Sequence, residues 1–304
     1  MAISAADRKR VKSQGFLSNR DGEHFSVRII TENGVLSASQ LKNLSEVAER
    51  FGNGNISFTS RMTLELPGIS FENIEAVKEY VAKDGMVTGG TGAKVRPVVS
   101  CKGSVCTFGL LDTQAIATQI HKRFFEGYGN VTLPHKFKIA VGGCPNNCVK
   151  PDLNDFGITG QNRPVLNTEA CRGCKKCLVE SSCPMQAAHF EEGTCQINRE
   201  LCNNCGICQR KCPFGAIETH TSGCRIYIGG RWGKQIRHGS MLKGIFSVEE
   251  ALDILEKSIL LFKEKGQPHE RFGSMIDRIG LDKVEQELLE GDLLQRKQQI
   301  LEKA

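Results

Sequence analysis

The sequence predicts an α+β chain in which a small cysteine-rich domain interrupts a larger one. Residues 24–83 alternate between strand-like and helix-like apolar periodicity. Within 162–220 this periodicity fades and the cysteine density rises, and strand-like sequence resumes afterwards. We therefore expect a first α+β domain at 1–94, a lobe made of 95–161 and 221–304, and an inserted domain at 162–220.

The first domain is predicted to be a ferredoxin-like half, because its elements follow the order strand, helix, strand, strand, helix. The polar residues 1–23 before it are expected to form an arm that packs late or stays partly mobile. Ser37 is a suitable N-cap for the first helix, and Gly52 to Gly54 would end that helix. Strands are expected at His24–Ile30, Asn55–Thr59 and Thr63–Leu66, and helices at Ser37–Phe51 and Phe71–Lys83.

In the second lobe, each of two short apolar strands leads into a pair of cysteines. A strand at Val95–Ser100 precedes Cys101, and a strand at Phe137–Val141 precedes Cys144. Ser247 and Glu250 form a capping-box pattern at the start of a long apolar-faced helix. The remaining elements are expected to be a helix at Thr113–Phe125, a strand at Arg225–Ile228, and helices at Ser247–Lys265 and about Leu281–Lys303.

Composition excludes several classes of protein. Of the 304 residues, 39% are hydrophobic, and no stretch approaches the roughly 18 apolar residues of a membrane span. The basic start of the chain lacks the apolar segment of a secretory signal, so we expect a cytoplasmic protein. A net charge of +6 with one Trp and three Tyr does not indicate nucleic-acid binding, but it suits a basic cavity for an anion or a poly-carboxylate cofactor.

Fourteen cysteines are many for a chain of this kind. A disulfide framework is typical of small secreted domains, and neither property fits this sequence. Thiols that stay reduced can instead bind metals or clusters. Metal or cluster binding is therefore favoured, and exposed clusters would imply an oxygen-sensitive, anaerobic setting.

The inserted domain carries two consecutive cysteine runs of the bacterial ferredoxin type. In this pattern three closely spaced thiolates bind one [4Fe–4S] cluster, and the cysteine before proline binds the other cluster. The first run has five residues before its last cysteine, two more than the common form, and we expect a small bulge there. A structural zinc site is the alternative, but zinc needs neither the repeated triplet nor the Cys-Pro. The predicted ligands are Cys171, Cys174, Cys177 and Cys212 for one cluster, and Cys183, Cys202, Cys205 and Cys208 for the other.

Two further pairs, Cys101 with Cys106 and Cys144 with Cys148, indicate another metal centre, and their spacing alone leaves zinc open. Gly143 and Pro145 restrict the backbone around the second pair. The two leftover cysteines, Cys195 and Cys224, are expected to be buried apolar thiols.

The chain resembles the siroheme-containing nitrite and sulfite reductase family. The resemblance is carried by Gly143-Cys144-Pro145-Asn146-Asn147-Cys148, by Lys136-Phe137-Lys138-Ile139, by Thr59-Ser60-Arg61 and by the glycine-rich Gly229–Lys234. It covers about Gly15 to Gly280, with a four-residue gap between the first two cysteines and Met62 after Arg61 as departures. The insert makes the chain most similar to the catalytic C subunit of anaerobic sulfite reductase and to dissimilatory-type subunits.

The resemblance implies a siroheme and a third [4Fe–4S] cluster, held by the first two cysteine pairs and joined to the siroheme iron through Cys148. It also implies that four basic residues bind and protonate the substrate anion, namely Arg61, Arg96, Lys136 and Lys138. Taken alone, Lys136 and Lys138 are equally consistent with a solvated strand face, and the two arginines with surface residues. Because siroheme carries eight carboxylates, the expected siroheme-binding residues are cations and amides, Arg28, Asn146, Asn147, Arg225, Arg231, Lys234 and Arg237.

The implied function is six-electron reduction of sulfite to sulfide, with electrons relayed through the insert. The sequence has no flavin or nicotinamide fingerprint, so a separate donor protein is expected, either a ferredoxin or flavin/iron–sulfur subunits. One ferredoxin-like half suggests a homo- or hetero-oligomer. The alternatives are reduction of nitrite to ammonia on the same scaffold, and a non-catalytic iron–sulfur protein for electron transfer or redox sensing.

Overall fold

The computed structural model describes residues 3–302, which divide into two compact units. The first unit contains the residues up to Val99, Ala117–Ile139 and the residues from Glu256 onward. The second unit contains Ser100–Ile116 and Ala140–Leu255. The expected organisation into residues 1–94, 95–161 with 221–304, and 162–220 is a different division of the chain and remains a prediction.

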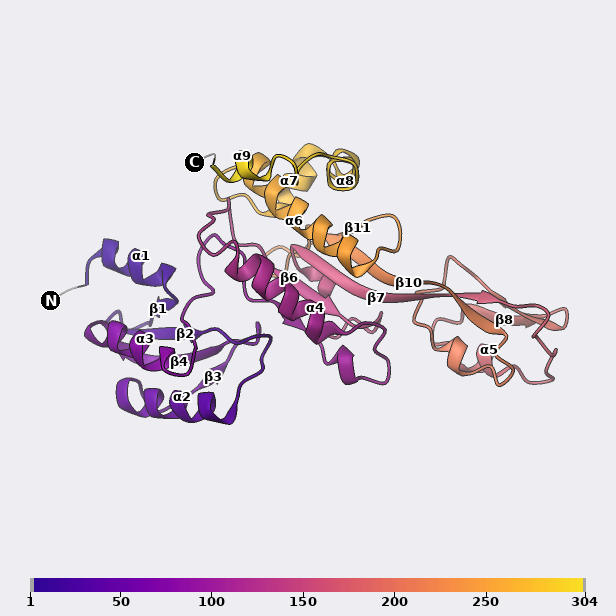
Figure 1. Ribbon diagram of the computed structural model, residues 1–304, viewed down its shortest axis with the longest axis horizontal. Coiled ribbons are helices and arrows are strands. Elements are labelled where there is room, and N and C mark those ends of the chain that lie inside the picture. Colours follow the sequence, from indigo (N-terminus) through magenta and orange to yellow (C-terminus); the bar gives the residue numbers. More distant parts are fainter. Residues whose placement is uncertain (1–2, 303–304) are drawn as a thin grey trace. The chain divides into compact units, whose positions relative to one another are not determined.

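The first unit begins with a four-stranded antiparallel sheet covered by two helices, as expected of a ferredoxin-like half (Figure 1). Its strand order is β1-β2-β4-β3. Alternate residues of β2 are buried and pack with apolar residues of α2 and α3 in one core. The elements are α1 (Ala5–Ser13), β1 (Phe16–Ser18), β2 (His24–Ile29), α2 (Ala38–Phe51), β3 (Ser57–Phe58), β4 (Leu64–Ser70), the 3₁₀ turn η1 (Phe71–Asn73) and α3 (Ile74–Ala82).

Local signals in the sequence account for the ends of α2. The Ser37 hydroxyl accepts a hydrogen bond from the Gln40 N–H, and the Gln40 side chain accepts one from the Ser37 N–H, which completes a capping box. Gly52 forms the C-cap, where an added Cβ would lie 2.8 Å from the Pro67 carbonyl oxygen. Both predicted ends of this helix are confirmed.

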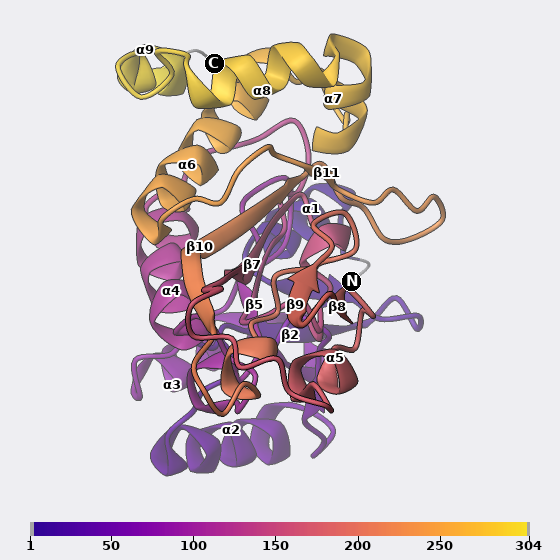
Figure 2. The ribbon, with the colours of Figure 1, turned by 90° about the vertical axis from the view of Figure 1, so that its right-hand side faces the viewer.

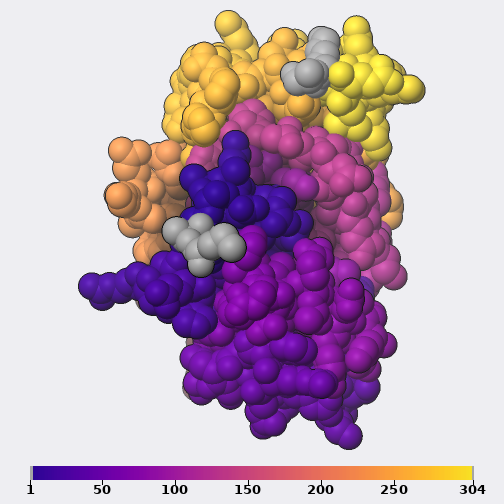
Figure 3. Space-filling model, turned by 90° about the vertical axis from the view of Figure 1, so that its left-hand side faces the viewer, coloured from indigo at the N-terminus to yellow at the C-terminus, as the bar shows by residue number. Residues whose placement is uncertain are grey.

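The described residues before His24, expected to form an arm that packs late or stays partly mobile, are packed against the sheet in the structure. α1 is capped by Ser4, and β1 pairs with β2. Val11 and Phe16 are fully buried in the core of the sheet. The segment was not recognised as packed because many of its residues are charged and its apolar face is narrow. In the structure this narrow face is sufficient to anchor the segment on the sheet. Figure 3 shows α1, in deep indigo, as part of a continuous surface with the purple residues of the sheet domain.

The first unit also includes helices that come much later in the chain. The helix expected at Thr113–Phe125 is present as α4 (Thr113–Ile120), followed by the π-helical η3 (His121–Glu126). α6 (Val248–Lys265) has the expected capping box of Ser247 and Glu250, and its C-terminal half belongs to this unit. Three more helices follow, α7 (Phe272–Ile279), α8 (Leu281–Leu289) and α9 (Lys297–Glu302).

The single helix expected over Leu281–Lys303 is wrong, because α8 ends at Leu289 and α9 begins at Lys297. Gly291 lies in the break, and an added Cβ there would lie 2.4 Å from the Glu287 carbonyl oxygen. Lys303, the last residue of the expected helix, lies outside the described residues. α7 was not expected from the sequence, although its Phe272 is fully buried against Phe137 and Phe262, with ring centroids 5.2 and 5.4 Å apart.

A buried carboxylate, Glu256, ties α6 to η3 and to α9. It accepts hydrogen bonds from the Tyr128 hydroxyl at 2.7 Å, from Arg123 at 2.8 Å and from Lys297 at 2.6 Å. Burial favours a raised pKa for this carboxyl, but the bonds from Lys297, Tyr128 and Arg123 outweigh burial and lower its pKa. The folded state is therefore stabilised by ionised Glu256 above its ordinary pKa, and this stabilisation is lost as the pH falls.

We expect Glu256→Ala to lower the free energy of unfolding by about 2 to 4 kcal/mol, because it leaves the buried Tyr128 hydroxyl and two cations without their shared acceptor. Urea unfolding followed by circular dichroism at pH 7 would measure the loss. Glu249→Ala, at an exposed position on the same helix, is the matched control. Equal stability of the two variants would show that the buried carboxylate does not stabilise the fold.

A five-stranded sheet forms the centre of the second unit, in the order β11-β10-β7-β6-β5. Two strands dominate it, β7 (Phe156–Leu166) and β10 (Ile217–Ile228), which pair antiparallel along nearly their whole length, with an irregularity at Thr219 to Thr221. The other strands are β5 (Val99–Ser100), β6 (Ile139–Gly142) and β11 (Ser240–Met241). β5 and β6 are shorter than expected, although Val95 and Phe137 also form an isolated bridge.

The cysteine-rich segment lies between β7 and β10. Its elements are α5 (Leu178–Ser182), the two-stranded sheet of β8 (Ala188–Glu191) and β9 (Thr194–Ile197), and the 3₁₀ turn η5 (Cys208–Arg210). Figures 1 and 2 show α5 and β8 beyond the far ends of the two long strands. In residues 3–302, no helix is both long enough and apolar enough to cross a membrane.

Candidate functional site

The first unit contains a pocket lined by five cations, which we call the cation pocket. It includes all four residues predicted to bind the substrate, together with one predicted siroheme-binding residue, and it encloses about 580 Å³ including its open mouth. Thr59, Ser60 and Thr63 supply hydroxyl groups at its wall. The five cations are Arg28, Arg61, Arg96, Lys136 and Lys138.

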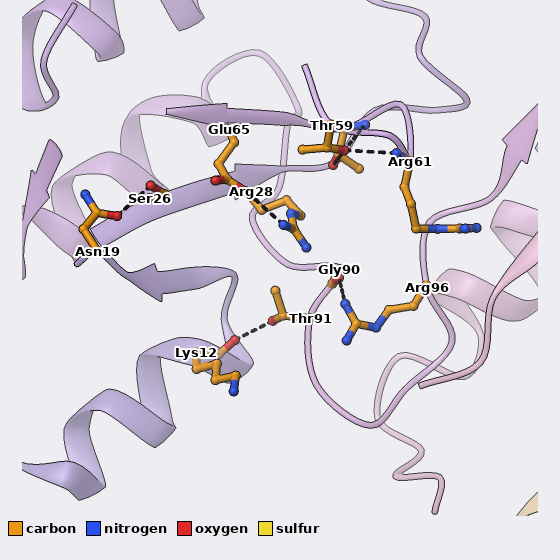
Figure 4. A network of polar contacts seen from close by, with 11 residues as sticks. Lys12, Asn19, Ser26, Arg28, Thr59, Arg61, Glu65, Gly90, Thr91 and Arg96 are labelled. Carbon is orange, nitrogen blue, oxygen red and sulfur yellow. Dashed lines mark hydrogen bonds and ion pairs between the residues drawn. The ribbon is translucent and has the colours of Figure 1, made fainter. Parts of the chain in front are cut away.

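Backbone carbonyl groups hold two of the arginines in place. Arg61 donates from Nε and Nη2 to the Pro97 carbonyl at 2.9 and 2.7 Å, and from Nη2 to the Ile139 carbonyl at 2.7 Å. Arg96 donates to the carbonyls of Gly90 and Gly92 at 2.6 and 2.9 Å. Figure 4 shows Arg28, Arg61 and Arg96 around Gly90. Guanidinium groups fixed in this way are organised before any anion arrives.

The turn between β3 and β4 positions Arg61. The Thr59 hydroxyl accepts hydrogen bonds from the N–H groups of Arg61 and Thr63, and it contacts the Thr63 hydroxyl at 2.7 Å. Met62 adopts a left-handed conformation with φ of 56°. The Thr31 hydroxyl donates to its carbonyl. Such a conformation costs of the order of 1 kcal/mol outside glycine, so the surrounding hydrogen bonds must support it.

The electrostatic environment of the cation pocket is strongly positive. Arg28 pairs with Glu65 at 2.9 Å. Beside the pocket, burial and then the charges of Arg271, Lys136 and Arg96 lower the pKa of His135 to about 4. Its Nδ1 accepts the Lys136 N–H at 2.7 Å. His135 is therefore neutral at pH 7, mainly because it is buried, and the cations that add to this shift would also attract an anion.

The first two cysteine pairs come together in the second unit. The pKa of the Cys144 thiol is raised, mainly by burial and further by the nearby Cys101, Cys148 and Cys106 thiols. Three of the four are partly buried, whereas Cys148 is exposed. The Gly143 N–H donates to the Cys101 sulfur at 3.1 Å, as amides do to cluster thiolates.

Close backbone contact explains the glycines around this group. A Cβ at Gly143 would lie 2.9 Å from the Gly103 Cα, so a larger residue would separate the two cysteine-bearing loops. The Thr113 hydroxyl, at the start of α4, donates to the Cys101 carbonyl at 2.6 Å and fixes the first loop. The four sulfur atoms therefore belong to one supported loop pair.

The predicted siroheme-binding residues are divided between the two units. Arg28 belongs to the cation pocket of the first unit, and the other six lie in the second unit. Asn147, with φ of 57°, donates to Asp152 at 2.8 Å, and Asp152 also pairs with His238 at 2.7 Å.

The glycine-rich loop at 229–239 carries three of these predicted residues. Arg231 and Arg237 exchange backbone hydrogen bonds of 2.8 and 2.9 Å, and Arg237 also donates to the Gly229 carbonyl at 3.0 Å. Lys234 is exposed at the tip, whereas Arg225 lies on β10 before the loop. The loop is thus held at its base and presents cations at its end.

In the cysteine-rich segment, eight cysteines line two cavities in the two groups expected from the sequence. One cavity, of about 360 Å³, is lined by Cys183, Cys202, Cys205 and Cys208. The other, of about 500 Å³, is lined by Cys171, Cys174, Cys177 and Cys212, and also by Cys195. The walls of both are otherwise largely apolar. Each cavity thus takes its last cysteine from the opposite run, as in the ferredoxin pattern.

The segment is an internal repeat in which the last cysteine of each run lines the cavity of the other run. The Ala187 N–H donates to the Cys183 sulfur at 3.3 Å, and the Ala216 N–H donates to the Cys212 sulfur at 3.4 Å. In turn the Asn198 N–H donates to the Ala187 carbonyl, and the Asn167 N–H donates to the Ala216 carbonyl. The side chains of both asparagines then cap the turn that leads to the next cysteine triplet. The sequence reasoning found the repeated cysteines but missed these matching asparagines and alanines.

Two details of this segment differ from expectation or add to it. The longer gap before Cys183 is not a bulge, because its two extra residues lengthen a helical turn into α5, where the second run has only η5.

Cys195 and Cys224 are buried thiols, as expected. Burial, then the neighbouring Cys177 and Cys171 thiols, raise the pKa of Cys195 to about 12. Cys195 therefore stays protonated beside its cavity, a position that spacing alone could not reveal.

The arrangement of the cysteines in the two cavities can be compared with the needs of a single ion and of a four-iron cluster. Within residues 3–302, no three thiol, imidazole or carboxylate groups converge closely enough to bind one metal ion. In a four-iron cluster each iron takes one thiolate, so the four ligands spread around a cube-sized space. The observed cavities, each with the four predicted cysteines at its wall and one N–H group directed at a cysteine sulfur, fit that chemistry.

Two family models match most of the chain. A model of the nitrite and sulphite reductase 4Fe-4S domain matches residues 91–297, and a model of the nitrite/sulfite reductase ferredoxin-like half domain matches residues 18–84. Together they span β2, β3 and β4 of the first unit, the five cations of the cation pocket and every cysteine named above.

Curated relatives carry sulfite reductase names. A coenzyme F420-dependent sulfite reductase of Methanocaldococcus jannaschii is 33% identical over 91% of this chain, and the chain spans 44% of that relative's length. An uncharacterised protein of the same organism is 30% identical over 88% of this chain and 91% of its own length. The C subunit of the anaerobic sulfite reductase of Salmonella typhimurium is 30% identical over 57% of this chain and 54% of its own.

Solved structures share the fold. Dissimilatory sulfite reductase I superposes with a TM-score of 0.70 over 87% of this chain and 68% of the other, at 23% identity. The Mycobacterium tuberculosis NirA protein superposes with a TM-score of 0.66 over 96% of this chain and 48% of the other, at 16% identity.

Proposed function

Because the chain belongs to the nitrite and sulfite reductase family, we propose that it is the siroheme- and cluster-binding subunit of a sulfite reductase. The observation that carries the proposal is the cation pocket, in which five cations from separate segments line one cavity. Sulfite reduction suits such a site, because a small oxyanion must be bound and then lose three oxygens as water.

The residues of the pocket have distinct tasks in this proposal. Arg61 and Arg96 present rigid guanidinium groups that bind and orient the anion. Lys136 and Lys138 hold protons beside it and deliver them as each S–O bond breaks. Bound siroheme and [4Fe–4S] clusters would carry the six electrons from the donor to the anion, which these side chains cannot do.

Three groups of cysteines would hold the clusters. Cys101, Cys106, Cys144 and Cys148 would hold the cluster that is coupled to siroheme through Cys148, and the eight cysteines of 162–220 would hold two more. The electrons would come from a separate donor protein, and the protein would work within a homo- or hetero-oligomer. Relatives named as subunits of larger sulfite reductases support this arrangement.

A nitrite reductase is the second candidate, because the NAD(P)H nitrite reductase of Bacillus subtilis is 23% identical over 83% of this chain. The cation pocket would accept either anion. Turnover of sulfite and of nitrite at equal supply of reduced methyl viologen would separate the two. We expect the higher kcat/KM with sulfite.

The absorption spectrum of anaerobically purified protein tests the proposal most directly. We expect a chlorin-type band in the red together with broad cluster absorption, and iron in excess of one cluster per chain. Broad absorption without the red band would instead support a non-catalytic iron–sulfur protein. The absence of both would contradict any cluster-based function.

A further inference from the structure

The two cysteine-lined cavities of the second unit differ in charge at their rims. The cavity of Cys171, Cys174, Cys177 and Cys212, which we call the first cavity, has Arg172 and Lys176 in its lining and no carboxylate. The cavity of Cys183, Cys202, Cys205 and Cys208, the second cavity, has no charged residue in its lining. The two sites are therefore related by the internal repeat but differ in what they present to a partner.

The sequence around each triplet shows the same contrast. Between Cys171 and Cys177 stand Arg172, Lys175 and Lys176, all of them exposed, and exposed Lys211 precedes Cys212. The corresponding stretch Cys202–Cys208 contains no charged residue. Carboxylates near the first cavity lie outside its triplet, at Glu169 and Glu180 and, next to the lining residues Phe190 and Ile217, at Glu191 and Glu218. Glu180 accepts a hydrogen bond from the Phe190 N–H at 3.0 Å.

Exposed apolar side chains accompany these cations. Leu178 and Phe214 line the first cavity, and about half of each side chain is accessible to solvent. A small apolar centre with charges around it is the usual composition of a transient protein interface. Electron transfer also requires that a partner come close to the cluster, and the first cavity is where these residues and four cysteines meet.

We propose that the rim of the first cavity, formed by Arg172, Lys175, Lys176, Leu178, Lys211 and Phe214, is the docking surface for an acidic electron-donor protein. Charge complementarity identifies the partner, because the lining of the first cavity contains two cations and no carboxylate. With exposed Lys175 and Lys211 beside them in the sequence, these cations outnumber the nearby carboxylates between and before the cysteines of the triplet, so the rim attracts an acidic surface and repels a basic one. The proposal rests on the proposed function and adds a direction to it: electrons enter at the cluster of Cys171, Cys174, Cys177 and Cys212.

Charge reversal of three exposed residues tests the proposal. The variant Arg172→Glu, Lys175→Glu, Lys176→Glu would be purified anaerobically with its clusters and mixed with reduced flavodoxin, an acidic donor whose semiquinone absorbs apart from the clusters. Since steering by opposite charges raises association rates about tenfold or more, we expect the bimolecular rate to fall at least about tenfold at low ionic strength. At about 0.5 M salt the variant and the wild type should nearly agree.

The matched control reverses three exposed cations of the first unit, Lys9→Glu, Arg20→Glu and Lys42→Glu. It has the same net charge as the test variant, and its rate with flavodoxin should stay within about twofold of the wild type. Reduction by methyl viologen, which needs no protein docking, should be unchanged in both variants. The visible spectrum of each variant verifies that its clusters are intact.

The possible results separate docking from function. An unchanged rate of flavodoxin oxidation in the test variant, or an equal loss of rate in the control, would overturn the docking surface. Reduction of the clusters by methyl viologen in the same samples would still support the proposed function. Salt-sensitive self-association that is lost in the test variant without a change in donor rate would also overturn it, because the rim would then bind a second copy. A wild type that neither donor reduces would contradict the proposed function itself, and the docking surface with it.

Discussion

Lys136→Met and Lys138→Met are each expected to lower kcat for sulfite reduction by about 100-fold or more with reduced methyl viologen as donor. Methionine keeps much of the side-chain length but removes the charge and the protons. Loss of one proton donor or of one fixed charge at a reacting anion commonly costs two to three orders of magnitude. Steady-state turnover with sulfite would measure the effect.

Anion binding gives a readout that does not depend on turnover. Perturbation of the siroheme band by added sulfite should require a higher anion concentration in both lysine variants, since each removes one of five cations from the cation pocket. Lys42→Met, at an exposed position of α2, is the control and should retain wild-type turnover and affinity. Wild-type kcat in both pocket variants would show that the lysines are a solvated strand face and not part of the catalytic site.

Arg61 is a less suitable target for the same experiment. Three of its hydrogen bonds hold the carbonyls of Pro97 and Ile139, so its removal disturbs the wall of the pocket as well as its charge. Arg61→Lys keeps the charge but cannot reproduce the fork, and a loss of activity in this variant would combine both effects. The lysines therefore give the clearer test of charge.

Much of the first sheet domain could be predicted because its signals are local. The alternation of His24 to Ile29 and the capping residues Ser37 and Gln40 act within one element, and the structure confirms both. α7 has apolar residues at helical spacing, Phe272, Met275, Ile276 and Ile279, and this local signal was overlooked. α1 was missed because its fully buried residue Val11 is surrounded in sequence by charged residues and gains its burial from the sheet. Composition cannot reveal such long-range packing.

The candidate site shows the same limit. The Cys-Pro pattern was enough to pair each triplet with the last cysteine of the other run, because ligand spacing is fixed by cluster geometry. Cys195 was identified as a buried thiol, but its place in the lining of the first cavity follows from β9, which turns it toward Cys177. Four of the five cations in the pocket were predicted through family resemblance, whereas Arg28 was expected among the siroheme-binding residues; no spacing rule relates Arg28 to Lys138.

Cys148→Ser is expected to remove the coupling between siroheme and its cluster while leaving the two clusters of the insert in place. Under the proposed function, this thiolate would hold the cluster and couple it to siroheme, and serine would be a poor replacement in that role. Cys148 is the exposed member of its group, whereas Cys101, Cys106 and Cys144 are partly buried, so the substitution should disturb the local fold little. Sulfite turnover should fall below about one hundredth of the wild-type rate.

Electron paramagnetic resonance of the reduced protein separates this outcome from a general loss of clusters. The variant should retain the signals of two interacting clusters, because the eight cysteines of 162–220 are untouched, and should lose the exchange-coupled signal. Cys224→Ala, at a fully buried thiol on β10 away from the cysteine-lined cavities, should retain every signal. If Cys148→Ser kept the coupled signal, one of the other three cysteines would have to couple the cluster to siroheme. The exposure of Cys148 would then reflect only its position at the end of the loop.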